Sequence, residues 1–364
     1  GLPGEGSAGC EDFGPYVRAN LTVTMGLPKL GMMIDPGVRA TGRVVVADIG
    51  FPRDLLEDES ICTNLMTMEQ AGRLLPTRKP SGHKGTFGKV MIVAGSEGMT
   101  GAAVLASRAA VRSGTGLVYA AYPRPLGVIM ESHLIEPVKI PLESDVAWLT
   151  LAQTREVINY ASDMNAMAFG PGVGRRPETI SFLRELITHV ETPLVIDADG
   201  LNLLAENLEE LTRRPGPTVL TPHPGEAARL LGCRVEEIEN NRLEAMAELS
   251  ERYGVVVVLK GAQTVTTEPN GQCTLNPTGN SGLAKGGSGD VLTGLIAGLL
   301  AQGCAPGEAA RLGVFVHGMA ADITAEKIGL RGMIPSDVID ALGPAFQRLE
   351  RSLGRDEKSI DTNT

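Results

Sequence analysis

A glycine-rich stretch directly before a helical pattern carries the clearest chemical signal in this chain. Residues 285–294 read KGGSGDVLTG, and the apolar residues that follow recur with helical spacing. Glycines at a helix N-terminus leave backbone N–H groups free and let a phosphate approach closely, so the stretch predicts an anion site. Its candidate phosphate-binding residues are Gly286, Gly287, Ser288 and Gly289.

Asp290 lies in the first turn of the same predicted helix. A carboxylate beside a bound phosphate is electrostatically unfavourable, which indicates a chemical role such as taking a proton from a substrate hydroxyl. The alternative is that Ser288 or Asp290 merely caps the helix. Four glycines around one aspartate favour the catalytic interpretation.

Two further motifs follow apolar runs and supply glycines or carboxylates. In FGPGVG, Gly172 and Gly174 let the backbone approach a planar or phosphorylated ligand, although a tight turn explains them equally well. In VIDADG, Asp197 and Asp199 flank Ala198, so on a continuing strand their side chains diverge and one can face a pocket. Asp199 can equally cap the following helix.

Three ionisable side chains also lie just after apolar runs of strand type. His223 lies in TPHPGE, where two prolines stiffen the loop and fix the direction of the imidazole, and ligand contact and a structural role both fit. Glu226 has two possible roles. It is either a carboxylate that supports a ligand-binding residue or a metal, or a favourable negative charge at a helix start. Lys260 follows VVVVL and precedes Gly261, which suits a phosphate or adenine-side contact; an exposed lysine at a sheet edge is the alternative.

The loop within residues 83–103 (HKGTFGKVMIVAGSEGMTGAA) is also rich in glycine. It has neither the dinucleotide-binding fingerprint nor the Walker A pattern, so backbone contact with a large ligand and a plain strand–helix turn both fit. No spacing among His, Cys and carboxylate side chains indicates zinc. The sequence therefore assigns no metal ligands.

The elements that must position these residues alternate between strand and helix. Six apolar runs are of strand type: VMIVAG, GLVYAAY, NAMAFG, PLVIDADG, TVLTPH and VVVVLKG. Most are followed by a helical pattern, which predicts an α/β fold with a mainly parallel sheet, helices on both faces and ligands at the carboxyl ends of the strands. Shorter apolar runs at 21–25 and 43–49 indicate a small α/β unit before it.

These patterns divide the chain into four parts. We expect an N-terminal segment at 1–52, a linker with a short helix at 53–82, a large domain at 83–350 and a polar tail at 351–364. The sequence opens at Gly1 in the manner of an internal segment, so we expect an upstream part.

Composition and charge narrow the class of protein. The net charge of −10 and the lack of a Lys/Arg cluster argue against a nucleic-acid surface. Neither a membrane-spanning run nor a signal peptide is recognisable, which indicates a cytoplasmic protein with no membrane contact. Five scattered cysteines, never in a C-x-x-C arrangement, indicate free thiols. The abundance of symmetric assemblies favours a homo-oligomer.

Taken in order, six motifs resemble the ADP-dependent NAD(P)H-hydrate dehydratase family: HKGTFGKVMIVAGSEGMTGAA, AFGPGVG, LVIDADGLNLL, LTPHPGEAARLL, VVLKGAQT and GNSGLAKGGSGDVLTGLIAGLLAQG. The resemblance covers about residues 83–342 and implies a ribokinase-like fold. Residues 19–52 resemble the end of the NAD(P)H-hydrate epimerase domain that precedes the dehydratase in bifunctional members. The upstream part that would carry the epimerase's substrate loop and catalytic aspartate is absent from this sequence, which leaves the epimerase activity of this chain open.

The resemblance implies conversion of the S form of hydrated NADH or NADPH (NADHX or NADPHX) back to the cofactor, with ADP yielding AMP and phosphate. The substrate hydroxyl would be phosphorylated and then leave as phosphate, with Asp290 acting at the hydrated ring and magnesium accompanying the phosphates. The residues implied to contact the hydrated cofactor are Ala102, Gly172, Gly174 and His223. Those implied to hold the adenine nucleotide are Lys260, Gly261, Ala262, Gln263, Thr264 and Gly289.

Two other functions are compatible with the same glycine-rich anion site. One is a ribokinase-like, ATP-dependent kinase of a small alcohol such as a vitamin precursor, and the other is a non-catalytic nucleotide-sensing module. The TPHPGE and HKGTFGKV motifs resemble the dehydratase more than those kinases. Loss of turnover in Asp290→Asn would separate either enzyme from the sensor.

Overall fold

The computed structural model describes residues 16–58 and 60–354. The opening residues with Cys10, and the part of the predicted tail from residue 355 onward, lie outside this range. The four described cysteines are free thiols, as predicted: Cys62, Cys233, Cys273 and Cys304. Among the described residues, no helix is both long and apolar enough to cross a membrane.

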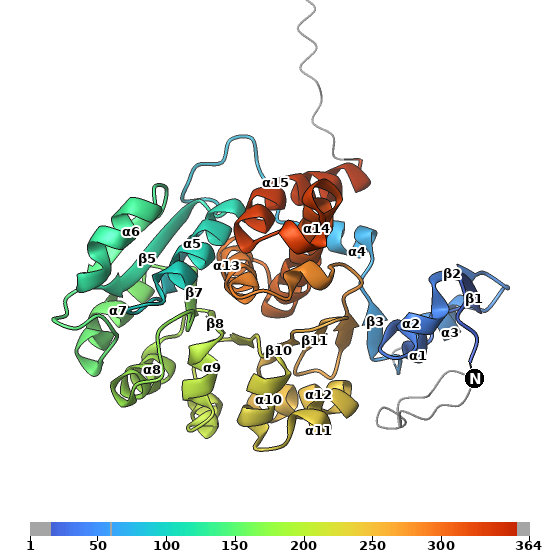
Figure 1. The fold of residues 1–364 in the computed structure, drawn as a ribbon, viewed down its shortest axis with the longest axis horizontal. Helices are drawn as coiled ribbons and strands as arrows, with labels where there is room; N and C mark the ends of the chain where they lie inside the picture. Colours follow the sequence, from blue (N-terminus) through green and yellow to red (C-terminus); the bar gives the residue numbers. More distant parts are fainter. Residues whose placement is uncertain (1–15, 59, 355–364) are drawn as a thin grey trace, which may run out of the picture.

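A ten-stranded sheet forms the middle layer of the molecule, in the order β3-β12-β11-β10-β9-β8-β7-β4-β5-β6 (Figure 1). Its strands are β3 (Thr63–Leu65), β4 (Lys89–Val93), β5 (Leu117–Pro123), β6 (Val138–Leu142), β7 (Ala166–Phe169), β8 (Leu194–Ile196), β9 (Thr218–Leu220), β10 (Val256–Leu259), β11 (Val265–Thr267) and β12 (Cys273–Leu275). Only β11 runs antiparallel to its neighbours β10 and β12. The mainly parallel sheet predicted from the sequence is therefore confirmed.

Strand β4 shows why the central strands are read as continuous apolar runs. Val90 and Ile92 belong to one hydrophobic cluster, whereas Met91 and Val93 belong to the other. Successive side chains of a strand point to opposite faces, so a strand covered on both faces is apolar at every position.

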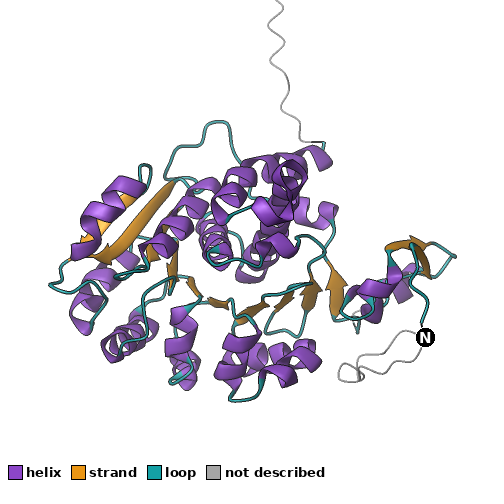
Figure 2. Cartoon of the chain, viewed as in Figure 1, coloured by secondary structure: helices purple, strands orange, loops and turns teal. Residues whose placement is uncertain are grey.

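Helices cover both faces of the sheet, which gives the predicted three-layer arrangement (Figure 2). One layer contains α4 (Met68–Arg73), α5 (Thr100–Arg112), α6 (Gly127–His133), α13 (Ser288–Ala301), α14 (Pro306–Gly332) and α15 (Pro335–Ser352). The opposite layer contains α7 (Thr154–Ala161), α8 (Pro177–His189), α9 (Asp199–Leu204), α10 (Pro224–Leu231), α11 (Val235–Asn240) and α12 (Arg242–Tyr253).

Helix α13 is held tightly against α5 because small residues line their contact. A Cβ atom on Gly294 would lie 1.9 Å from the carbonyl oxygen of Ala106, and one on Gly298 would lie 2.1 Å from Ser113 Oγ. Neither position has room for a side chain. This backbone-to-backbone approach fixes the place of the α13 N-terminus, which carries the glycine-rich motif.

A small N-terminal unit lies beyond the β3 edge of the sheet (Figure 1). Its elements are β1 (Leu21–Met25), α1 (Leu30–Met33), α2 (Val38–Thr41), β2 (Arg43–Ala47) and α3 (Arg53–Leu56). Strands β1 and β2 pair in parallel, as expected for a small α/β unit. They form a separate two-stranded sheet.

The segment predicted as a linker, residues 53–82, contributes to the large sheet. Its predicted short helix is α4, and its strand β3 pairs in parallel with β12. A three-residue strand of sequence TNL is too short and polar to show a strand pattern. The sheet therefore begins inside the predicted linker, and the four-part division of the chain stays a prediction.

Candidate functional site

Five predicted motifs converge because they follow five adjacent parallel strands. Strands β10, β9, β8, β7 and β4 are neighbours in that order, and each of these pairs is parallel. Their carboxyl ends therefore meet at one edge of the sheet, where ligands bind in open α/β folds. The glycine-rich start of α13 also lies there, since a Cβ on Gly289 would be 3.3 Å from Lys260 Nζ.

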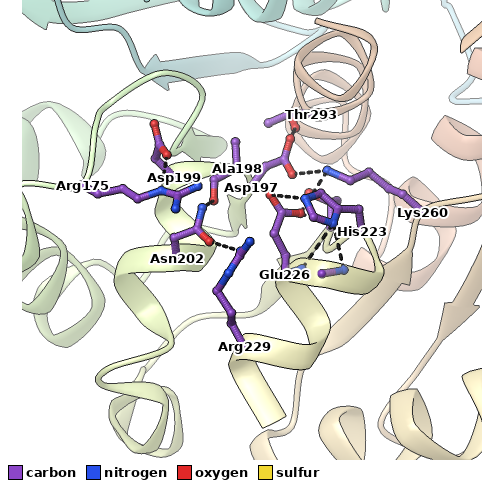
Figure 3. Close-up of polar contacts among 12 residues, drawn as sticks. Arg175, Asp197, Ala198, Asp199, Asn202, His223, Glu226, Arg229, Lys260 and Thr293 are labelled. Carbon is purple, nitrogen blue, oxygen red and sulfur yellow. Dashed lines mark hydrogen bonds and ion pairs between the residues drawn. The ribbon is translucent and has the colours of Figure 1, made fainter. Parts of the chain in front are cut away.

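A buried ion pair occupies the centre of this edge (Figure 3). Lys260 Nζ donates to Asp197 Oδ1 at 2.7 Å, and the Asp197 side chain is 1 % exposed. Thr293 of α13 donates to the other carboxylate oxygen of Asp197. Burial alone would raise the pKa of Asp197, but the Lys260 charge and hydrogen bonds from Lys260, Thr293 and Thr221 hold it below its usual value. Lys260 is thus a buried, paired cation and not an exposed edge lysine.

The paired charges favour the ionised form of both partners. Burial lowers the pKa of Lys260, but Asp197 and then Glu226 outweigh this and raise it. Lys260 Nζ lies 3.6 Å from Glu226 Oε2. The ammonium group is thus held beside the glycine-rich loop, since a Cβ on Gly289 would lie 3.3 Å from Lys260 Nζ.

Asp290 differs from Asp197 because it is left unpaired at the start of α13. Among the described residues, none donates a hydrogen bond to its carboxylate or forms an ion pair with it. Burial raises its pKa to about 7, and the negative charges of Asp197, Asp199 and Glu226 add to this effect, while Lys260 opposes it. A carboxyl group that titrates near neutral pH is suited to general-base catalysis.

The start of α13 offers backbone N–H groups that no side chain uses. Its N-cap is Gly287, with φ +96°, and no side chain caps the helix. The positive φ is accessible to glycine without steric cost. A Cβ added to Gly286 would meet no atom within 4 Å, so this part of the loop borders open space. These are the features of an anion site at a helix N-terminus.

Helix α14 holds the loop that leads into this site. Asp322 accepts hydrogen bonds from the Gly279 backbone N–H at 2.9 Å and from Asn280 Nδ2 at 2.8 Å. Lys285 Nζ donates to the Arg331 and Met333 carbonyl oxygens. Lys285 therefore anchors the loop instead of reaching toward a phosphate, although it lies within the glycine-rich motif.

His317 of α14 also lies at this site, although no motif around it in the sequence indicates a role. Burial and then the Lys260 charge lower its pKa to about 4, and a contact with the Ser288 backbone opposes the shift. Its Nε2 has no hydrogen-bond partner among the described residues. His317 therefore lies as a neutral imidazole behind the start of α13.

His223 and Glu226 cap α10 reciprocally. The His223 Nδ1 accepts from the backbone N–H groups of Gly225 at 3.0 Å and Glu226 at 3.3 Å, while Glu226 Oε2 accepts from the His223 backbone N–H. Because Nδ1 is an acceptor, we assign the proton of the neutral ring to Nε2. The imidazole is half-exposed, and burial is the main cause of its lowered pKa. The structural role is thus present, and Nε2 lies 3.5 Å from Glu226 Oε1.

The predicted substrate-binding glycines meet α5 and the loop after β8. A Cβ on Gly172 would lie 3.1 Å from Ala102 Cβ, which brings these two predicted residues together. Asp199 accepts from the Gly174 backbone N–H at 3.1 Å and from Arg175 Nε at 3.0 Å. Asp199 is therefore not the cap of α9, whose N-cap is Ala198 without a side-chain cap.

The two aspartates diverge, but a turn and not a continuing strand separates them. Strand β8 ends at Ile196, and Ala198 has φ +52°, which turns the chain between Asp197 and Asp199. Asp197 consequently points to Lys260, while Asp199 points to Arg175 (Figure 3).

The predicted nucleotide-binding loop is shaped by two residues with positive φ, Gly261 and Gln263. Arg242 of α12 donates from Nη1 to the Ala262 carbonyl oxygen at 2.8 Å, and Thr264 Oγ1 donates to the Gly261 carbonyl oxygen at 3.0 Å. Arg242 Nε and Nη2 and Gln263 Oε1 are buried without a partner among the described residues. These groups are available to a polar ligand at this loop. Arg242 could not be singled out from the sequence, because it lies in an ordinary polar helix.

No group of three His, Cys, Asp or Glu side chains within the described residues is arranged to hold a metal ion.

Comparisons with known proteins point to one family. The NAD(P)H-hydrate dehydratase family profile matches residues 90–344. The chain is 44 % identical to the bifunctional NAD(P)H-hydrate repair enzyme of Moorella thermoacetica over 94 % of this chain and 64 % of that enzyme. It therefore spans less than two thirds of the length of that relative. The ADP-dependent (S)-NAD(P)H-hydrate dehydratase of Neisseria meningitidis is 36 % identical, over 83 % of this chain and its own whole length.

A crystal structure of the ADP/ATP-dependent NAD(P)H-hydrate dehydratase from Bacillus subtilis, co-crystallised with ATP and Mg²⁺, is also similar. It has a TM-score of 0.69 and 32 % identity, and the match covers 80 % of this chain and 100 % of that one. A hydroxyethylthiazole kinase from Pyrococcus horikoshii shares the fold alone, at 14 % identity and a TM-score of 0.50. With its ribokinase-like fold, the chain belongs to the NAD(P)H-hydrate dehydratase family.

Proposed function

We propose that this chain repairs hydrated nicotinamide cofactors, by converting the S form of hydrated NADH or NADPH back to the cofactor at the expense of ADP. The observation that carries the proposal is the unpaired Asp290 carboxyl group, with a pKa of about 7, at the uncapped start of α13. Family membership supplies the substrate class, and the relative from Neisseria is named for the same reaction.

In the first step, the hydroxyl group of the hydrated ring attacks the terminal phosphorus of ADP. Asp290 takes the hydroxyl proton as the new O–P bond forms and the bond to the departing AMP breaks. The backbone N–H groups of Gly287 and Gly289 stabilise the transferring phosphoryl group, together with the fixed charge of Lys260. Magnesium, when bound, neutralises phosphate charge during this transfer.

In the second step, the C–O bond of the phosphorylated ring breaks and inorganic phosphate leaves. The ring nitrogen's electron pair assists this departure, and loss of a proton from the neighbouring ring carbon restores the dihydronicotinamide. The balance is one hydrated cofactor and one ADP consumed, with one cofactor, one AMP, one phosphate and one proton formed.

In this proposal, separate groups of residues contact the substrate and the nucleotide. Ala102, Gly172, Gly174 and His223 line the side of the hydrated cofactor. The loop from Lys260 to Thr264 lies on the nucleotide side, where Arg242 and Gln263 present buried polar atoms without partners among the described residues.

The test compares ADP with ATP as the phosphate donor and the two epimers of hydrated NADH as substrates. Purified protein is incubated with hydrated NADH, magnesium and either ADP or ATP, and the dihydronicotinamide absorbance is followed. We expect a rise that requires ADP, consumes the S epimer and disappears in Asp290→Asn. If folded protein that binds ADP gives no rise with either nucleotide, the proposal is wrong, and small alcohols become the candidate substrates of a kinase.

We also propose a cytoplasmic location and a homo-oligomeric state. Four free thiols among the described residues support a reducing compartment. The frequency of symmetric assemblies supports the oligomer, which sedimentation measurements would test.

A further inference from the structure

A cleft of about 290 Å³ opens beside Gly174, and the proposed function gives it no role. Its walls come from the loops that follow β4, β6 and β7. Its lining includes Ser96, Met99, Trp148, Gly174, Arg175 and Arg176.

The cleft continues outward from the proposed reaction centre. A Cβ on Gly172 would touch Met99 and Ala102, and one on Gly174 would lie 3.6 Å from Ser96 Oγ and 3.7 Å from Met99 Cε. Asp199 links the two regions, since it binds the Gly174 N–H and Arg175 and its charge acts on Asp290. An extended substrate that contacts Ala102 and Gly172 would therefore continue past Gly174 into the cleft.

The walls of the cleft combine an aromatic face with two guanidinium groups. Arg176 lies over the Trp148 ring, with Cζ 4.0 Å from the ring centroid. Arg175 is already paired with Asp199, whereas Arg176 forms no ion pair with any described residue and is exposed. An indole and planar guanidinium groups are suited to a flat base that carries phosphate. Glu97 is the only carboxylate in the lining, and with Arg175 paired to Asp199 the cation of the lining that has no ion pair among the described residues is Arg176.

We propose that this cleft binds the adenosine phosphate half of the dinucleotide substrate, with Arg176 at the phosphates and Trp148 at the base. This inference rests on the proposed function, because it takes the substrate to be a hydrated dinucleotide. The volume is below the range of about 300–1,000 Å³ for pockets that enclose a whole ligand, so it fits one half of a dinucleotide. Binding energy from this remote half would hold the reacting ring at Asp290.

The fluorescence of Trp148 gives a direct test, because Trp148 is the only tryptophan of the chain. ADP-ribose is titrated without magnesium, as a probe that lacks the nicotinamide ring. We expect the emission of Trp148 to change on binding, and Arg176→Gln to weaken the apparent affinity by about tenfold, the loss expected for one charge-assisted contact. Arg184→Gln, which changes an exposed arginine of α8 outside the cleft, is the matched control and should bind normally.

A second control separates the cleft from the anion site. Gly289→Ala places a Cβ beside Lys260 and should leave the Trp148 response to ADP-ribose unchanged. A response that is lost in Gly289→Ala but kept in Arg176→Gln would place ADP-ribose at the nucleotide loop and overturn the inference. No change of emission in the wild-type protein would overturn it as well.

Kinetics supply an independent readout. Arg176→Gln should raise the KM for hydrated NADH by about tenfold while kcat/KM for hydrated, reduced nicotinamide mononucleotide, which lacks the adenosine phosphate, stays unchanged. Equal losses for both substrates would contradict the inference. If the wild-type protein dehydrates neither compound, the proposed function fails, whereas the fluorescence titration still decides whether the cleft binds the probe.

Discussion

Helices α10 and α13 both begin at the same edge of the sheet, yet their first turns are used differently. In α10, His223 and Glu226 satisfy each other's backbone N–H groups. In α13, the N-cap is Gly287, and no side chain satisfies the first N–H groups. The first-turn carboxylate of α10 is hydrogen-bonded and close to Lys260, whereas that of α13 is unpaired.

The difference shows how one local structure serves two purposes. A capped start stabilises a helix by satisfying its orphan donors. An uncapped start that faces open space leaves those donors for an anionic ligand. The sequence TPHPGE therefore forms a capped, stabilised helix start, and the sequence GGSGD forms an uncapped helix start that can bind an anion.

The largest effect is expected for Asp290→Asn. Loss of the base should lower kcat by about 10²–10⁴-fold, the usual contribution of a general base. Steady-state turnover with hydrated NADH and ADP checks this. Retention of more than a tenth of the activity would show that the carboxylate of α13 is as structural as that of α10.

The same substitution should stabilise the fold at alkaline pH. The pKa of Asp290 is raised to about 7 in the folded state, so the folded protein prefers the protonated form. The carboxyl group therefore destabilises the fold increasingly as pH rises from about 4 to about 7, and fully above that. Asp290→Asn should raise Tm at pH 8 and leave it nearly unchanged at pH 4. In the wild-type enzyme, kcat/KM should rise with pH through about 7, as the base deprotonates.

Lys260→Met is expected to have the next largest effect, on stability. It leaves Asp197 buried without its cation, which typically costs about 3–5 kcal/mol of unfolding free energy. Urea titration measures the loss, and the double variant with Asp197→Asn should recover most of it. A loss below about 1 kcal/mol in the single variant would mean that the ion pair contributes little to the fold.

A pair of glycine substitutions sharpens the comparison between the two helix starts. Gly289→Ala places a Cβ 3.3 Å from Lys260 Nζ, at the open start of α13, and should raise the KM for ADP by about tenfold with little change in Tm. Gly225→Ala places a Cβ 2.9 Å from His223 Cε1, inside the closed cap of α10, and should lower Tm while the KM for ADP stays unchanged. The reverse result would show that the roles of the two helix starts are exchanged.

The smallest effect is expected for His223, and two variants separate its roles. His223→Ala removes the acceptor for two backbone N–H groups and should cost about 1 kcal/mol. His223→Asn retains a cap but removes Nε2–H, so a raised KM for hydrated NADH in this variant alone would demonstrate substrate contact. Normal kinetics in His223→Asn would leave only the structural role.

The sequence was sufficient to predict the central sheet and to predict which motifs follow its strands. Strands β4, β5, β7, β8, β9 and β10 are apolar at nearly every position, which makes them recognisable, and their parallel order brings Asp197, His223 and Lys260 to one edge. Strands β3 and β11 read TNL and VTT, each with two polar residues in three, and together with β12 they owe their conformation to pairing with neighbours. Local sequence does not encode such long-range pairing.

Side-chain partners within the site were harder to predict, for the same reason. Thr293 and His317 come from helices far along the chain, and their contacts with Asp197 and Ser288 arise from packing. The turn at Ala198 was also hidden, because alanine rarely adopts a positive φ. The sequence predicted which motifs lie at strand ends. It did not predict the distances between the side chains of those motifs.

Strand β3 has a consequence for handling the protein. It is the last strand of the large sheet, and an open edge of this kind can pair with another chain and promote aggregation. Leu65 of β3 lines an apolar pocket together with Met32 and Met33 of the small N-terminal unit, so that unit shields this end of the sheet. A version trimmed to begin at residue 60 would retain every proposed site residue but expose that edge, and it should express with lower solubility than the longer chain.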